Sequence, residues 1–364
     1  MGTKLGLVGL PNAGKSTLFN ALTAAHAAVA PYPFTTTDPN VGVAQVEDPR
    51  LVALAACLSP ERVIPTSIEF VDIAGLVQGA HQGEGLGNQF LSHILGVDAL
   101  LHVVRCFADD HVAHPMGAVD PVRDIEVVTT ELLLKDVEIV ERRAEKERKL
   151  AKGGDARAVQ LMERLDAWSA ALSAGKPIRS LGLPAEHHPS TFGIGLLTSK
   201  PVLYAANIGE GQGRDSPTLV EAVRALAATE AAEVVAFCAK LEAELTELEA
   251  ADRAAMMREL GVADSALPQV IRRGYALLRL VTFFTTASKI LQAWTVPQGT
   301  KAPQAAGTIH TDFERKFIRA EIIQADALVR CGSEANARAQ GLLRLEGKEY
   351  AVQDGDVVHF KVGQ

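Results

Sequence analysis

The sequence lacks paired cysteines, long apolar runs and an excess of positive charge. Its four cysteines lie far apart without a CxxC pair, which is typical of reduced thiols rather than of a disulfide framework or a zinc site. No apolar run approaches about 18 residues, and the N-terminal residues do not form a signal peptide, so we expect a cytoplasmic protein without a membrane partner. The net charge of -8 excludes a chain that is basic throughout, so any RNA contact must be local and no DNA partner is expected.

Two enzyme signatures are also missing. The dinucleotide-binding fingerprint GxGxxG does not follow the first expected strand, which excludes a dehydrogenase of that type. The acceptor site and the lid of a P-loop kinase are not recognisable either. The chain is long and apolar enough to form several domain cores. Its 364 residues, with a hydrophobic fraction of 48%, predict roughly two or three globular domains.

Hydrophobic periodicity predicts an α/β fold in the first part of the chain. Short β-rich runs alternate with helical ones, as in a doubly wound parallel sheet. The expected strands are 5–8, 68–71 and 99–104, followed after a gap of about ninety residues by 201–206 and 233–237. The gap indicates an insertion into the sheet.

The insertion has helical periodicity. A Gly-Gly pair at 153–154 separates two helical runs, which predicts an antiparallel helical hairpin. In the second run, one helix face carries the apolar residues Leu161, Leu165, Trp168 and Leu172. Between residues 141 and 152, six basic residues stand against three acidic ones, which fits either a solvated helix face or a contact with RNA or a protein partner. The basic residues are Arg142, Arg143, Lys146, Arg148, Lys149 and Lys152.

The chain changes in character near residue 281. Aromatic and β-branched residues are punctuated there by turn-forming dipeptides, which predicts a small mixed α+β module. The expected domains are therefore an α/β domain of residues 1–120 and 195–280, an inserted helical arm of residues 121–194 and a C-terminal module of residues 281–364.

Residues 9–17, Gly-Leu-Pro-Asn-Ala-Gly-Lys-Ser-Thr, match the phosphate-binding pattern GxxxxGK[ST] between an expected strand and an expected helix. The backbone N–H groups of such a loop surround the phosphates, and the helix N-terminus adds its dipole. Lys15 is expected to neutralise the β- and γ-phosphates and to act in catalysis, while the Ser16 hydroxyl ligates Mg²⁺. The residues expected to bind the nucleotide here are Asn12, Ala13, Gly14, Lys15, Ser16 and Thr17.

Two further segments complete the expected metal and phosphate site. Asp72, at the end of a buried apolar run, begins a DxxG pattern and is expected to hold Mg²⁺ from the other side, usually through water. The N–H of Gly75 meets the γ-phosphate and is counted with the catalytic groups. In the polar loop 33–37 we choose Thr36 as a Mg²⁺ ligand, against the simpler interpretation of a turn of β-branched residues.

The segment after the fifth expected strand departs from a guanine-binding loop. Guanine specificity normally comes from Asn-Lys-x-Asp, but here the chain reads Asn207-Ile208-Gly209-Glu210. The lysine stem that would cover the base is missing, and the acid is one methylene longer. The paired hydrogen bonds to guanine are therefore expected to be lost, and the loop no longer discriminates against adenine. Asn207, Ile208 and Glu210 are still expected to contact the nucleotide.

The position after the DxxG pattern also departs from a regulatory GTPase. It often carries a glutamine that orients the attacking water, but here it is Leu76, which cannot hydrogen-bond water, so slow hydrolysis is expected. We favour His114 as the replacing group, because its loop leaves the carboxyl edge of the sheet, where a doubly wound fold binds its ligand. An exposed loop histidine without a role is the simpler alternative. The other polar candidates are His81, Gln82 and His111.

Together these residues resemble the YchF family, the Obg-like ATPases among the translation-factor-related P-loop proteins. The likeness runs essentially end to end and includes the phosphate loop, residues 32–34, 83–90, 102–107 and 353–357. Residues 293–295 and 302–313 are similar to the family's TGS domain, a β-grasp fold. The chain departs from the family at His81-Gln82 and Leu95-Gly96, and the first pair follows DxxG, so we expect different switch kinetics.

The resemblance implies ATP binding and hydrolysis, association with ribosomes and a role in translation or the stress response. It also implies a histidine involved in hydrolysis at position 114, and K⁺ held beside the phosphates by Asn12, a residue that equally suits a turn. The leading hypothesis is a monomeric, Mg²⁺-dependent ATPase switch that acts at the ribosome. The alternatives are an Obg-type GTPase and a nucleotide-dependent binding protein with negligible hydrolysis.

Overall fold

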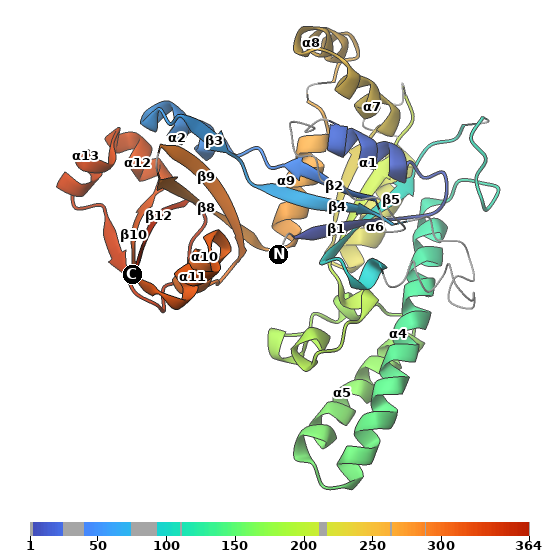
Figure 1. Ribbon diagram of the computed structural model, residues 1–364. Helices are drawn as coiled ribbons and strands as arrows, with labels where there is room; N and C mark the ends of the chain where they lie inside the picture. The colour runs from blue at the N-terminus through green and yellow to red at the C-terminus, as the bar shows by residue number, and fades with distance from the viewer. Residues whose placement is uncertain are drawn as a thin grey trace. The chain divides into compact units, whose positions relative to one another are not determined.

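The computed structural model describes residues 3–24, 40–73, 93–109, 111–210, 217–262, 264–287 and 289–363. The chain divides into two compact units, each made of two separate segments of sequence. Unit 1 comprises Met1–Ala44 and Glu69–Leu277, and unit 2 comprises Gln45–Ile68 and Leu278–Gln364. The elements of both units are labelled in Figure 1.

Unit 1 is built on a six-stranded sheet with the order β2-β4-β1-β5-β6-β7. From β4 to β7 each strand runs parallel to its neighbours, and every residue of β5 is buried, as expected for a strand covered on both faces. The predicted α/β fold with a doubly wound sheet is confirmed. The strands are β1 (Lys4–Val8), β2 (Asn40–Gln45), β4 (Ser67–Asp72), β5 (Ala99–Arg105), β6 (Val202–Asn207) and β7 (Glu233–Phe237).

Helices bury the apolar faces of these strands. Val220 and Val223 of α6 join Ile125 of α4 in one core with strand residues such as Val104 and Val202. Because parallel strands are joined by crossovers, their carboxyl ends meet at one edge of the sheet, and the candidate site lies there. Besides the arm, the helices of unit 1 are α1 (Lys15–Ala24), α6 (Pro217–Thr229), α7 (Ala239–Glu247), α8 (Ala250–Glu259) and α9 (Leu267–Leu277).

The insertion between β5 and β6 forms the predicted helical hairpin, drawn in green in Figure 1. Asp120 and Asp155 are the N-cap residues of its two long helices. Between the helices the chain reverses at Gly153 and Gly154, the second of which has φ of 87°. The predicted apolar stripe is buried between the helices. The arm consists of α4 (Pro121–Lys152), α5 (Ala156–Ser173) and the short 3-10 helices Ile178–Leu181, Ala185–His187, Pro189–Phe192 and Leu197–Ser199.

None of the helices in the described ranges has the length and the apolar composition that crossing a bilayer requires.

Unit 2 is built on a second six-stranded sheet with the order β11-β10-β12-β8-β9-β3. Its hairpin of β8 and β9 is antiparallel, whereas β12 pairs with β8 in parallel. The strands are β3 (Arg62–Ile64), β8 (Leu280–Ala287), β9 (Ile290–Pro297), β10 (Phe317–Gln324), β11 (Arg344–Glu346) and β12 (Asp356–Val362). The helices are α2 (Pro49–Leu58), α10 (Ala302–Ile309), α11 (Thr311–Arg315), α12 (Ala325–Cys331) and α13 (Glu334–Ala339).

Unit 2 takes in residues 45–68, which the sequence analysis placed in the α/β domain of residues 1–120. Leu51 and Leu54 of α2 are buried in the same core as Phe284, and β3 extends the sheet by pairing with β9. Arg50 donates to both carboxylate oxygens of Asp354, at 2.6 and 3.3 Å. These partners lie hundreds of residues apart, so no local pattern in the sequence indicates them. In Figure 1 the blue α2 and β3 accordingly lie among the orange and red elements of unit 2.

Candidate nucleotide-binding site

The phosphate loop joins β1 to α1 in a conformation that requires glycine at two positions. Gly9 has φ of 149°, and a Cβ atom there would lie 2.3 Å from the carbonyl oxygen of Val103 in β5. Gly14 has φ of 97°, and a Cβ atom there would lie 2.3 Å from Nδ2 of Asn207 in β6. Only glycine therefore lets the loop approach both strands so closely.

Lys15 begins α1, and its side chain folds back onto the phosphate loop. Its ammonium donates to the carbonyl oxygens of Gly9 and Leu10, at 3.0 Å each. Burial lowers the pKa of Lys15, and the nearby charge of Asp72 partly opposes this shift. A lysine ammonium has three donors, so one remains for a phosphate oxygen. This arrangement suits a cation that neutralises phosphate charge.

Ser16 and Asp72 form the candidate magnesium site. The Ser16 hydroxyl donates to Oδ2 of Asp72 at 3.2 Å, and Oδ1 of the same carboxylate is buried without a hydrogen-bond partner among the described residues. An unpaired buried carboxylate oxygen is unfavourable, and a cation or its bound water would satisfy it. Among the described residues there is no cluster of three or more His, Cys, Asp or Glu side chains that could hold a metal ion.

Several predicted residues lie outside the described ranges. Thr36 and Gly75 are among them, as are the alternative water-orienting residues His81 and Gln82. Their roles at the metal and the γ-phosphate remain predictions.

The loop after β6 contains the predicted Asn207, Ile208 and Glu210. Asn207 is buried; its side-chain amide donates to the carbonyl oxygen of Ala13 at 2.9 Å and accepts from the N–H of Ala239 at 3.0 Å. Ile208 is buried as well. The carboxylate of Glu210 accepts a hydrogen bond from the Lys240 ammonium at 2.7 Å. Asn207 thus joins the phosphate loop to the start of α7, while Glu210 is neutralised by a lysine.

A cavity of about 660 Å³ lies beside this loop. Its volume is within the range of about 300 to 1,000 Å³ that is usual for small-molecule sites. Residues from the phosphate loop, the loop after β5, the loop after β6 and α7 line it, so it is the natural place for a base and ribose. The predicted residues that line it are Asn12, Gly14, Thr17, Asn207, Ile208 and Glu210.

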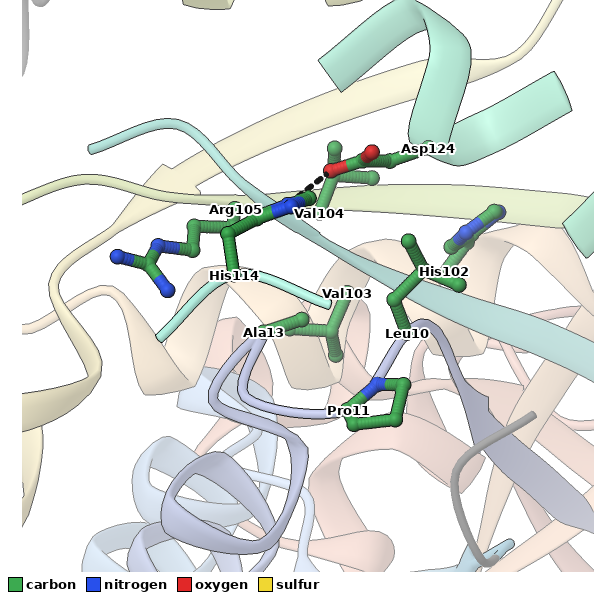
Figure 2. Close-up of a pocket in the computed structure, with 9 residues that line it drawn as sticks. All are labelled: Leu10, Pro11, Ala13, His102, Val103, Val104, Arg105, His114 and Asp124. Carbon is green, nitrogen blue, oxygen red and sulfur yellow. Dashed lines mark hydrogen bonds and ion pairs between the residues drawn. The ribbon is translucent and has the colours of Figure 1, made fainter. Parts of the chain in front are cut away.

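His114 lies at the same edge of the sheet, but it does not line that cavity; it lines a smaller pocket beside the phosphate loop, which Figure 2 draws. Its Nε2 atom is 2.8 Å from Oδ2 of Asp124 in α4, and its Nδ1 atom accepts the N–H of Met116 at 3.1 Å. Figure 2 shows the ring directed at Asp124 and away from Pro11 and Ala13 of the phosphate loop. Only 4% of the side chain is exposed. His114 is therefore close to the phosphate loop but engaged elsewhere.

Three residues of the site were missed by the sequence analysis. Arg105, at the end of β5, donates to the carbonyl oxygens of Phe107, Asp109 and Ala113 and so holds the loop that carries His114. Asp124 binds His114, and Lys240 binds Glu210. An arginine at the end of a buried strand was a usable signal, whereas the partners of Asp124 and Lys240 depend on tertiary packing.

A glycine-rich phosphate loop, a buried lysine and a serine–aspartate pair at the carboxyl edge of a parallel sheet define a P-loop NTPase. A family model described as 50S ribosome-binding GTPase matches residues 4–143, and the YchF-GTPase C-terminal model, described as a protein of unknown function, matches residues 280–363. The chain belongs to the YchF family, as its similarity to full-length relatives shows.

Those relatives match along almost their whole length. The Ribosome-binding ATPase YchF of Bacillus subtilis is 49% identical over 363 residues, and that of Haemophilus influenzae is 48% identical over 361 residues; each match covers 99% of both chains. The solved structure of the Schizosaccharomyces pombe YchF GTPase has a TM-score of 0.87 and 35% identity, and the match covers 99% of this chain and 97% of that one.

Proposed function

We propose that this protein binds Mg²⁺ with ATP, hydrolyses the ATP slowly and acts as a switch at the ribosome. The phosphate loop with Lys15 and the Ser16–Asp72 pair supports the hydrolysis of a nucleoside triphosphate. In that complex Ser16, Asp72 and the predicted Thr36 hold Mg²⁺, which neutralises the charge of the β- and γ-phosphates. The names of the bacterial relatives, ribosome-binding ATPases, support both the nucleotide and the partner.

One observation carries the preference for ATP: Glu210 is bound to Lys240. A carboxylate that binds guanine must accept hydrogen bonds from the ring N–H and the exocyclic amine. In this structure the Glu210 carboxylate already accepts one from an ammonium, and Ile208 stands where the guanine-binding loop has a lysine. Adenine carries no matching N–H at that ring position, so it loses nothing at this loop.

Titration with fluorescent ATP and GTP analogues tests this preference. We expect ATP to bind at least as tightly as GTP. Tenfold tighter GTP binding, a difference of about 1.4 kcal/mol, would support the Obg-type GTPase instead. Single-turnover hydrolysis of radiolabelled ATP then separates an ATPase from a binding protein that uses nucleotide only as a ligand.

We propose His114 as the group that orients the attacking water, once its side chain leaves Asp124. Replacing it with alanine should lower kcat about tenfold to a hundredfold, with ATP affinity nearly unchanged. Full kcat in His114→Ala, together with a collapse in His81→Ala or Gln82→Ala, would move the role to the DxxG loop. His111, whose N–H donates to Asp109, serves as the control from the same loop.

We propose the basic end of α4 as part of the ribosome-facing surface. Five of its six basic residues are exposed, and the sixth, Arg143, pairs with Glu147 at 2.9 Å. Phosphate backbones attract such a cluster in a salt-dependent manner. Changing Arg142, Lys146 and Lys149 to glutamine should reduce cosedimentation with ribosomes at physiological salt.

Three exposed basic residues of unit 1 outside the arm, Arg224, Arg258 and Arg272, provide a control with the same change in net charge. Equal pelleting of both triple variants and the wild type would remove the arm from the proposed surface. Point variants are needed on unit 2 as well, because deletion of residues 281–364 would also strip Leu51 and Leu54 of their core partners.

A further inference from the structure

Both ring nitrogens of His114 are occupied. The N–H of Met116 donates to Nδ1, so that nitrogen carries the lone pair and the proton lies on Nε2. Nε2 then donates to Oδ2 of Asp124 at 2.8 Å. With 4% of the His114 side chain and 6% of the Asp124 side chain exposed, neither ring nitrogen is available to a water molecule.

This arrangement indicates whether Asp124 speeds or slows hydrolysis through His114. An aspartate that activates a histidine binds one ring nitrogen and leaves the other to face the reacting water. Here the second nitrogen accepts the Met116 N–H instead. The contact therefore holds the imidazole in a position from which it cannot act on water.

Asp124 lies in the first turn of the long arm helix, α4. The helix is N-capped by Asp120, and the second oxygen of Asp124 is 3.2 Å from Nη2 of Arg123. Twelve residues further along the same helix, Asp136 is fully buried and accepts hydrogen bonds from the N–H groups of Leu197 and Thr198. Two buried carboxylates thus hold the helix: Asp136 binds the 3-10 helix Leu197–Ser199 within the arm, and Asp124, nearer the site, binds His114.

We propose that Asp124 is a positioning residue that keeps His114 in an inactive orientation, and that displacement of the first turn of α4 releases it. This inference rests on the proposed role of His114 in hydrolysis. A shift of only about 1 Å would stretch the 2.8 Å contact beyond hydrogen-bonding distance. Because α4 extends for 32 residues to the basic end of the arm, a partner bound there reaches the hydrolysis site through this helix.

Steady-state ATP hydrolysis by the full-length chain tests the proposal. In Asp124→Ala we expect kcat to rise about threefold to tenfold, the factor that releasing one hydrogen bond of ordinary net strength gives, with KM changed less than about twofold. Asp124→Asn keeps an acceptor for Nε2 without its charge, so its kcat should fall between those of the wild type and Asp124→Ala. Asn is also close to Asp in size, so this variant decides the matter where Asp124→Ala does not fold.

Two controls separate positioning from a general loosening of the arm. Asp155→Ala removes the N-cap of the second arm helix, α5, without loosening the turn that carries Asp124, and should leave kcat unchanged. The double variant His114→Ala/Asp124→Ala should hydrolyse ATP no faster than His114→Ala. Amide hydrogen exchange gives a readout besides activity, because the Met116 N–H should exchange faster in Asp124→Ala.

A fall of kcat in Asp124→Ala toward the level of His114→Ala would show that Asp124 activates the histidine and would overturn the proposal. An unchanged kcat despite faster exchange at Met116 would also overturn it, because release would then not limit the reaction. Full kcat in the single variant His114→Ala would refute the role of His114 itself, and the proposal with it. Failure of the proposed role of His114 can therefore be told apart from failure of the proposed role of Asp124, because the single variant His114→Ala leaves Asp124 in place.

Discussion

The side-chain amide of Asn207 donates to the carbonyl oxygen of Ala13, 194 residues earlier in the chain, at 2.9 Å. Its oxygen accepts the N–H of Ala239, the first residue of α7. A residue chosen from the sequence as a base contact thus joins the phosphate loop to the wall of the neighbouring cavity. Its effect on nucleotide binding should accordingly pass through the phosphates, which every nucleoside triphosphate shares.

Asn207→Ala should weaken ATP and GTP binding by the same factor, about tenfold. The reason is that the carbonyl of Ala13 and the N–H of Ala239 lose a buried partner, at a cost of about 1 to 3 kcal/mol. Asn207→Asp is the matched variant, since it keeps the acceptor for Ala239 and loses only the donor to Ala13. Fluorescence titration with both nucleotides measures the effect, and a loss confined to one of them would make Asn207 a base reader.

Asp72→Asn should raise the Mg²⁺ concentration needed for tight ATP binding about tenfold to a hundredfold. The unpaired Oδ1 of Asp72 and the Ser16 hydroxyl on Oδ2 place its charge where the metal is expected. Glu69→Gln, which removes one carboxylate from the same strand and its ion pair with Lys4, is the control. A Mg²⁺ titration of ATP affinity that is identical in Asp72→Asn and the wild type would exclude this residue from the metal site.

Hydrolysis should be faster in K⁺ than in Na⁺ at equal ionic strength. Nδ2 of Asn12 donates to the carbonyl oxygen of Ala113 at 3.0 Å, so the amide oxygen is the atom left to bind a cation beside the phosphates. The extra positive charge would stabilise the transition state. Asn12→Ala should remove the difference between the two ions, whereas equal rates in the wild type would leave K⁺ without a role.

Lys240→Met should improve GTP binding relative to ATP binding about threefold or more. The substitution frees the Glu210 carboxylate to accept hydrogen bonds from guanine while keeping an unbranched side chain beside the cavity. Lys240→Arg, which retains a donor for Glu210, should leave the ratio of the two affinities as it is. An unaltered ratio in Lys240→Met would mean that the ion pair does not govern base choice.

The sequence was most informative where a motif determines local backbone geometry. The positions of Gly9 and Gly14 predicted the phosphate loop, and alternating apolar runs predicted the strands at whose ends Asp72 and Asn207 lie. The apolar spacing around Trp168 likewise predicted the buried face of α5. Such features are readable because neighbours in sequence are also neighbours in space.

The missed features depend on residues that are far apart in the chain. No local pattern shows that Glu210 binds Lys240. A loop histidine such as His114 gives no sign of which way its ring points, because a rotamer change costs little and the choice depends on Asp124. The same limit explains why the sequence analysis placed residues 45–68 in the α/β domain, although they belong to unit 2.

Asp136 should make the stability of the arm depend on pH. Burial raises the pKa of Asp136 from its ordinary value of 3.8 to about 6, although hydrogen bonds from Thr198 and Leu197 oppose the shift. A raised pKa means that the stabilising contribution is fully present below about pH 4 and is lost as pH rises through about 6. Between pH 4.5 and pH 7.5 the loss amounts to about 2 kcal/mol.

Urea unfolding at these two pH values checks this expectation. Trp168, buried in the arm, reports the transition once the other tryptophan, Trp294, has been changed to phenylalanine. The stability difference between this protein and its Asp136→Asn variant should be about 2 kcal/mol larger at pH 4.5 than at pH 7.5. Asp166→Asn, on the exposed face of α5, controls for the loss of one charge; a difference that stays constant with pH would contradict the expectation.

The two-segment construction of unit 2 imposes an order on biosynthesis. Arg50 in α2 meets its partner Asp354 only after 304 further residues have been added, which takes roughly 15 to 60 s at about 5 to 20 residues per second. Until the C-terminal segment has been translated, Leu51 and Leu54 lack the core residues that later bury them. The nascent chain therefore presents an apolar helix to chaperones before the strands that will cover it have been translated.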